Sequence, residues 1–274
     1  MLNKFLFLIL TISILSCNSK KTETKLTILG TMHFPTEKID ADSIYEVLKK
    51  VNPDYILMEI DSSFFNSDFT FKKTFDENEY NAVAKYQKEK PSVKIRPIEF
   101  EGRNKYRKSI GIFPEASLSF QKLNKLHNEK LYKADEQKIW DKYEYYWSLA
   151  DSLDNGNLKA INNKKADNII DSLMYYQYSE LLKITNSRTE FEDSGLIDAK
   201  KDTITLKEYY KKWSEFEGTD RNNALSNNTL NIVKNNPNNT FIVLTGFKHR
   251  FYIIKTLRQK QKEHNFELIE FYEY

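Results

Sequence analysis

The segment KLTILG (25–30) decides the fold, because a short apolar strand candidate ends there at a glycine and a second apolar run follows it. That second run, YILMEI (55–60), is typical of a buried strand and is interrupted by one acid, Glu59. Between the two runs, apolar residues recur with the spacing of one helical face: Ile44, Val47, Leu48 and Val51. The order strand, helix, strand predicts parallel strands joined by a right-handed crossover.

Further elements extend this pattern. Ser43 and Glu46 form a capping box that predicts the start of the first helix, and the stretch 52–54 (NPD) ends it. A helix at about 77–88 leads to a third strand candidate, VKIRPIEF (93–100). Near the C-terminus we expect a strand TFIVLT (240–245), a helix at about 249–262 and a closing strand FELIEFY (266–272). The alternation predicts an α/β fold with a mainly parallel central sheet and flanking helices.

The middle of the chain, about 104–234, contains no convincing β run and is predicted to be a large helical insertion. Helical stretches are expected at 131–153, 165–184 and 206–217. The first carries an aromatic stripe, which we interpret as core packing rather than a ligand cage: Tyr132, Trp140, Tyr143, Tyr146 and Trp147. We expect this insertion to shape substrate access rather than to supply reacting groups.

The N-terminus has the pattern of a lipoprotein signal. Lys4 is followed by an apolar run, and Ser16 precedes Cys17, the single cysteine of the chain, at the end of an ILSC lipobox. The run is too short for a stable transmembrane helix. We therefore predict a signal peptide at 1–16, a lipidated Cys17 with a polar tether over 17–25, and a single domain over 26–274. The alternative is an ordinary secretory signal that ends near a cysteine.

The charge balance argues against one class of partner. There are 42 basic and 39 acidic residues, and the charges are interspersed rather than gathered in stripes. Nucleic acid is therefore not an expected partner. The expected partners are a membrane, through the lipid anchor, and an unknown peptide or small-molecule substrate.

The same G-x-x-H pattern follows two strand candidates. GTMH (30–33) follows the first strand and GFKH (246–249) follows the late one, in a chain with only four histidines. Loops at the carboxyl ends of parallel strands bind ligands, so His33 and His249 are expected to face one crevice. Glu59 ends the second strand, where a buried carboxylate is costly unless it is paired or bound to metal. These three residues form a candidate catalytic or metal-binding set.

Other polar residues are weaker candidates. By strand alternation, one of Glu99 and Glu101 should point to solvent. The remaining histidines, His127 and His264, lie in polar helical surroundings and are interpreted as surface residues.

The motifs LGTMHF and LMEI, together with the late strand that ends in G-x-x-H, resemble the Tiki/TraB superfamily, which includes erythromycin-esterase-like and ChaN-like proteins. The resemblance covers roughly 25–102 and 220–274. It implies that His33, Glu59 and His249 build the active site of a metal-dependent protease or esterase, with Mn, Co or Zn as the metal. It adds Arg221, from the stretch DRN (220–222), as a secondary catalytic candidate that orients a substrate carboxylate or carbonyl. Lys248 departs from the small residue that related sequences carry, and a cation there would weaken metal binding.

Three functions remain open at this point. The leading one is an envelope-anchored hydrolase that activates water for attack on a peptide or ester carbonyl, with or without the metal. The second is a lipoprotein that binds haem or another small ligand without catalysis. The third is a structural envelope protein. For all three we expect a lipid-anchored location in a bacterial cell envelope, on the periplasmic side or at the cell surface.

The anchor gives the first testable prediction. Cys17→Ala should release the chain from the membrane fraction, because acyl chains supply nearly all the membrane affinity of such a protein. The neighbouring Asn18→Ala variant is the matched control and should stay bound. Fractionation and immunoblotting measure both, and membrane retention of Cys17→Ala would contradict the lipoprotein assignment.

Overall fold

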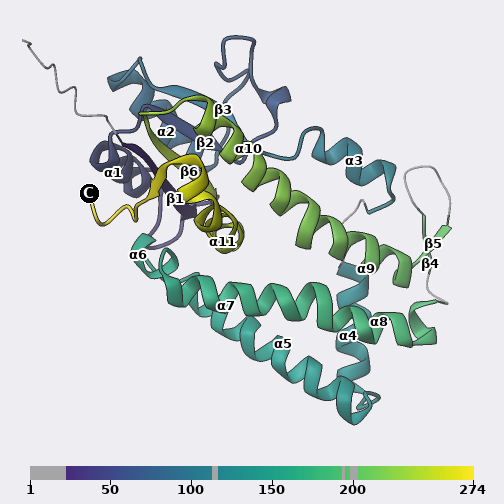
Figure 1. The fold of residues 1–274 in the computed structure, drawn as a ribbon. Helices are drawn as coiled ribbons and strands as arrows, with labels where there is room; N and C mark the ends of the chain where they lie inside the picture. The colour runs from purple at the N-terminus through teal and green to yellow at the C-terminus, as the bar shows by residue number, and fades with distance from the viewer. Residues whose placement is uncertain (1–22, 113–116, 193–194, 198–202) are drawn as a thin grey trace, which may run out of the picture.

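The computed structural model describes residues 23–112, 117–192, 195–197 and 203–274. The signal peptide, Cys17 and most of the tether lie outside these residues. The α/β class is confirmed: five parallel strands form a central sheet in the order β3-β2-β6-β1-β7, flanked by helices (Figure 1). The strands are β1 (Thr24–Thr31), β2 (Tyr55–Met58), β3 (Lys94–Pro97), β6 (Thr240–Gly246) and β7 (Phe266–Leu268).

Helices cover both faces of this sheet. Strand alternation divides β6 between two apolar clusters: Ile242 and Leu244 face one side, Phe241 and Val243 the other. The first cluster includes residues of α1 (Ala41–Val51) and α2 (Asn78–Glu89), and the second includes residues of α10 (Arg221–Asn235) and α11 (Phe247–His264). Both faces of the central strands are therefore buried, as a parallel sheet requires.

The helical insertion forms a separate layer beside the sheet (Figure 1). Its helices are α3 (Arg103–Ser109), α4 (Ser117–Asn128), α5 (Ala134–Leu153), α6 (Leu158–Ile161), α7 (Lys164–Tyr175), α8 (Leu181–Ser187) and α9 (Leu206–Glu215). Two π-helical segments, η2 (Tyr176–Glu180) and η4 (Phe216–Asp220), join α7 to α8 and α9 to α10. Short 3-10 turns lie at η1 (Ser62–Phe64) and η3 (Thr189–Phe191).

Several predicted details were wrong. The first helix begins one turn earlier, because Asp40 caps it and Ser43 completes that capping box at the third helical position. The middle of the chain does contain strands, since β4 (Gly195–Ile197) pairs with β5 (Thr203–Thr205) in an antiparallel hairpin too short to produce a periodic signal. The closing strand ends at Leu268, because the chain then turns and Glu270 pairs with the buried Arg250.

The aromatic stripe of α5 is only partly core. Trp140 is 1% exposed and Tyr143 is 7% exposed, as core packing predicts. Trp147 is 45% exposed, so the prediction is wrong at this position. Within the described residues, no helix is both long and apolar enough to cross a bilayer.

Two buried polar contacts fix the insertion to the sheet. Strand β7 covers β1 only up to Leu26, and beyond it Asn162 of the insertion takes the place of a neighbouring strand. Its side chain accepts from the Gly30 amide at 2.6 Å and donates to the Gly30 carbonyl at 2.8 Å. Arg250 of α11, fully buried, pairs with Asp167 of α7 and with Glu270. The insertion therefore contacts the strand that leads to His33.

Candidate active site

The sheet order brings the predicted site residues together. Strand β6 lies between β1 and β2, with Thr31 opposite Gly246 and Met58 opposite Leu244. His33 follows β1, Glu59 follows β2, and His249 lies in the first turn of α11 after β6. These three residues and Arg221 line one cavity of about 700 Å³ at the carboxyl ends of the strands, which we call the sheet-edge cavity.

Glu59 is a fixed, ionised carboxylate. One oxygen accepts hydrogen bonds from the Thr245 hydroxyl at 2.5 Å and the Gly246 amide at 2.8 Å, and the other accepts from Arg221 Nη2 at 2.5 Å. Burial acts to raise the pKa of Glu59, but its neighbours His249, Arg221 and His33 and the Thr245 hydrogen bond outweigh this effect and hold the pKa well below its ordinary value. The Glu59 carboxylate at the end of β2 is therefore negatively charged at neutral pH.

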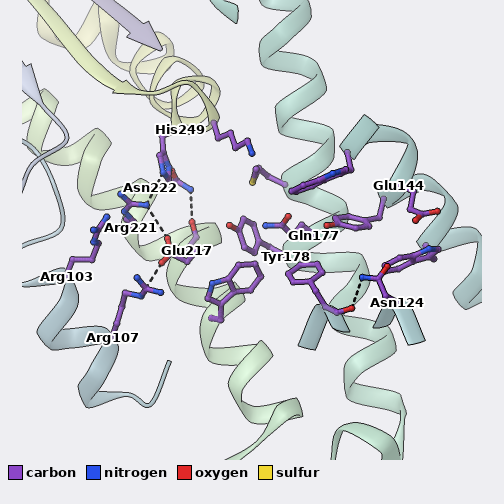
Figure 2. Close-up of a pocket in the computed structure, with 17 residues that line it drawn as sticks. Arg103, Arg107, Asn124, Glu144, Gln177, Tyr178, Glu217, Arg221, Asn222 and His249 are labelled. Atoms are coloured by element: carbon purple, nitrogen blue, oxygen red, sulfur yellow. Dashed lines mark hydrogen bonds and ion pairs between the residues drawn. The ribbon is translucent and has the colours of Figure 1, made fainter. Parts of the chain in front are cut away.

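Arg221 is the cation that neutralises this region. Its guanidinium is buried and pairs with three carboxylates: Glu59, Glu99 and, at 3.3 Å, Glu217. Glu99 also accepts from Arg103 at 3.1 Å. Figure 2 shows Arg221, Asn222 and Glu217 gathered beside His249. Each nitrogen of the Arg221 guanidinium donates to a carboxylate or to His249. We therefore assign to Arg221 the positioning of its neighbours rather than direct contact with a substrate.

His249 is held as a neutral imidazole of one tautomer. Asn222 donates through Nδ2 to the Glu217 carbonyl, so its Oδ1 faces His249 Nδ1 at 2.8 Å and accepts the ring proton. The other ring nitrogen, Nε2, accepts from Arg221 Nη1 at 3.0 Å. Burial lowers the pKa of His249 to about 4. Both nitrogens of this ring are therefore occupied at neutral pH.

His33 is the accessible histidine. Its side chain is 49% exposed, and its Nδ1 lies 2.9 Å from a carboxylate oxygen of Glu79, which is itself nearly buried. The hydrogen bond to Glu79 raises the pKa of His33 to about 9, against the effect of burial. Asn78 positions this pair, because its backbone amide and its side chain bind the carbonyls of His33 and Met32.

Gly246 allows the close approach of these groups. A Cβ atom added there would stand 3.1 Å from His33 Nε2 and 3.7 Å from a Glu59 oxygen. His33 Nε2 and Glu59 therefore flank one point directly above the end of β6. Gly246, the glycine of the second G-x-x-H motif, therefore also leaves room for His33, the histidine of the first motif.

The arrangement does not fit a metal ion shared by His33, Glu59 and His249. The described residues contain no group of three or more His, Cys, Asp and Glu side chains arranged to hold one. Arg221 donates to His249 Nε2 and to a Glu59 oxygen, the same atoms that would coordinate the metal. Binding of Mn, Co or Zn remains a prediction that requires the guanidinium to move away.

Sequence reasoning missed several members of this network. Glu79 and Glu217 were not considered, and Asn222 was noted only as the residue after Arg221. Of the two glutamates after the third strand, Glu99 is buried and Glu101 is exposed, as predicted. Strand alternation is not the reason, because β3 ends at Pro97 and residues two apart on a strand share a face. The interpretation of His127 and His264 as surface residues was incomplete, because both are partly buried, and neither lines the sheet-edge cavity.

Comparison of the chain with family models, curated proteins and solved structures finds no match. The resemblance to the Tiki/TraB superfamily therefore rests on the motifs at 30–33, 57–60 and 246–249.

The His33–Glu79 pair gives a prediction for stability against pH. A histidine whose pKa rises to about 9 on folding stabilises the fold fully below its unfolded pKa of 6.5, and this contribution is lost as the pH rises to 9. After discounting for a half-exposed ring, the free energy of unfolding should fall by about 1 kcal/mol across this window. Glu79→Gln should abolish this decrease in stability. Glu37→Gln changes an exposed residue of the loop that contains His33, and this variant should show the same decrease as the wild type. Urea unfolding at pH 6.5 and 9 measures this, and the same decrease in all three proteins would contradict the assignment.

Proposed function

We propose that the chain is an envelope-anchored hydrolase in which His33 activates water for attack on a peptide or ester carbonyl. One observation carries the proposal: a histidine oriented by a nearly buried carboxylate, Glu79, presents its other ring nitrogen to a cavity. A base oriented by a third group in this way is the usual arrangement for proton transfer in hydrolysis. The lipid anchor at Cys17 and a location on the periplasmic side or at the cell surface are part of the proposal.

The reaction uses residues of the chain alone. His33 donates Nδ1–H to Glu79 and accepts a proton from water at Nε2, while the water oxygen forms a bond to the substrate carbonyl carbon. The bond from that carbon to the leaving oxygen or nitrogen then breaks, and His33 returns its proton to the leaving group. Glu59, beside Nε2, is placed to accept the second proton of the water in a hydrogen bond.

The cations divide into two roles. Arg221 is saturated by three carboxylates and holds Glu59 and His249 in place. Arg103 lines the same cavity, pairs with Glu99 through one nitrogen and has a side chain that is 32% exposed. We therefore assign to Arg103 the stabilisation of the charge that develops on the carbonyl oxygen. This differs from the role that the family resemblance implies for Arg221.

Hydrolysis of a panel of esters and peptides tests the proposal. His33→Ala should reduce kcat/KM by about 100-fold or more, because a positioned general base contributes at least that factor. His264→Ala, which removes a histidine outside the sheet-edge cavity, should leave the rate unchanged. The rate should rise with pH up to about 9 as His33 loses its proton, and Glu79→Gln should move this rise toward pH 6.5. Full activity of His33→Ala would refute the proposal.

One observation favours the second candidate function, the binding of haem or another small ligand. A cavity of about 710 Å³ between the insertion, α10 and α11 has six aromatic side chains in its lining, including Tyr143 and Tyr178. His249 reaches this cavity, but Arg221 occupies its Nε2. A Soret band on addition of haem to a chain without hydrolytic activity would support this candidate over the hydrolase.

A further inference from the structure

We propose that the cavity between the helical insertion and the first turns of α10 and α11 binds the ring-bearing, negatively charged end of the substrate whose carbonyl is hydrolysed at His33. We call it the insertion cavity. The assignment of this occupant as part of a substrate rests on the proposed hydrolase function, whereas the binding chemistry of the cavity rests on its own residues. The substrate class is then an ester or amide that carries an aromatic acid remote from the bond to be cleaved.

The walls of the insertion cavity suit the face of a ring. Six aromatic side chains contribute, from α4, α5, η2 and α9: Phe120, Trp140, Tyr143, Trp147, Tyr178 and Trp213. Trp140, Tyr143 and Trp213 are nearly buried and form the back of the wall, whereas the other three rings are at least partly exposed. Rings of this kind bind a flat apolar group through offset stacking and edge contacts. Trp147 is 45% exposed and is therefore available to an incoming ligand.

The helices are irregular at the points where they border this cavity. Both π-helical segments contribute to its lining, η2 through Gln177 and Tyr178 and η4 through Glu217. The two segments are in direct contact, since a Cβ atom at Gly218 would stand 2.9 Å from the ring of Tyr178. π-helical turns inside α-helices occur frequently at functional sites. The contact between η2 and η4 at the edge of this cavity therefore supports a binding role for the space between the helices.

Lys248 supplies the charge for an anion. Its ammonium group lies 5.2 Å from the centre of the Trp147 ring. Burial raises the pKa of Asp154 and the charge of Lys248 lies near enough to lower it, but the described residues show no direct ion pair between the two side chains. Arg107 and Arg221, by contrast, are paired with Glu217. A carboxylate attached to the ring would therefore meet a cation that is in no direct ion pair among the described residues.

The insertion cavity adjoins the reaction site. Arg103, Arg221 and His249 line both this cavity and the sheet-edge cavity. Figure 2 shows Arg221 and His249 on one side of the insertion cavity and Asn124 and Glu144 on the other. The proposal therefore requires one substrate to extend past Arg103, with its ring beside Trp147 and its carbonyl beside His33.

Calorimetric titration of the full chain with 2-naphthoate and with its neutral analogue 2-naphthamide tests the binding. The wild type should bind the anion more tightly than the amide. Lys248→Met should remove this preference, a loss of about fivefold that is typical of one partly exposed ion pair. Trp147→Ala should weaken both ligands about fivefold, through loss of stacking.

Matched variants make the result decisive. Lys255→Met, on the same helix as Lys248, and Tyr145→Ala, an exposed aromatic on the helix of Trp147, should bind both ligands like the wild type. His33→Ala should also bind normally. If the wild type binds 2-naphthoate but hydrolyses no ester or peptide of the panel, the proposed function is rejected and the binding site is kept. No binding of 2-naphthoate, equal binding of the two ligands, or identical affinities in Lys248→Met and Lys255→Met would overturn the inference.

Discussion

The buried guanidinium of Arg221 holds together three parts of the chain that are far apart in sequence. It pairs with Glu59 after β2, Glu99 after β3 and Glu217 of the insertion. Removing one partner of a buried ion pair costs about 3–5 kcal/mol, because the remaining charge is left uncompensated. The relative position of the sheet edge and the insertion therefore depends on this cluster, and so does the protonation state of the residues around it.

Arg221 also determines which histidine has an unoccupied ring nitrogen in the described structure. By donating to Nε2 of His249, it occupies the only lone pair of that ring, whose other nitrogen is bound by Asn222. His33 lacks such a partner at Nε2 in the described structure and faces the cavity. Two histidines with the same G-x-x-H motif thus differ in environment, since one is a buried neutral member of the cluster and the other is a half-exposed ring hydrogen-bonded to Glu79.

The sequence predicted the parallel sheet and the convergence of His33, Glu59 and His249, because strand ends and motif positions are local properties. It could not predict Glu79, whose place beside His33 depends on how Asn78 of α2 binds the loop after β1. The β4–β5 hairpin was not predicted, because strands of three residues are too short to show an alternation of apolar and polar residues. The pairing of Arg221 with the expected metal ligands is a matter of side-chain packing, and no motif encodes it.

The protonation and metal response of His249 test the central role of Arg221 most directly. Nitrogen-15 NMR of the imidazoles at pH 7, assigned with a His249→Gln variant, should show a neutral His249 with its proton on Nδ1. The signal should be unchanged by Zn²⁺ or by EDTA, because Arg221 occupies Nε2. Titration of His249 near pH 6.5, or a large shift of its Nε2 signal on addition of Zn²⁺, would contradict the account.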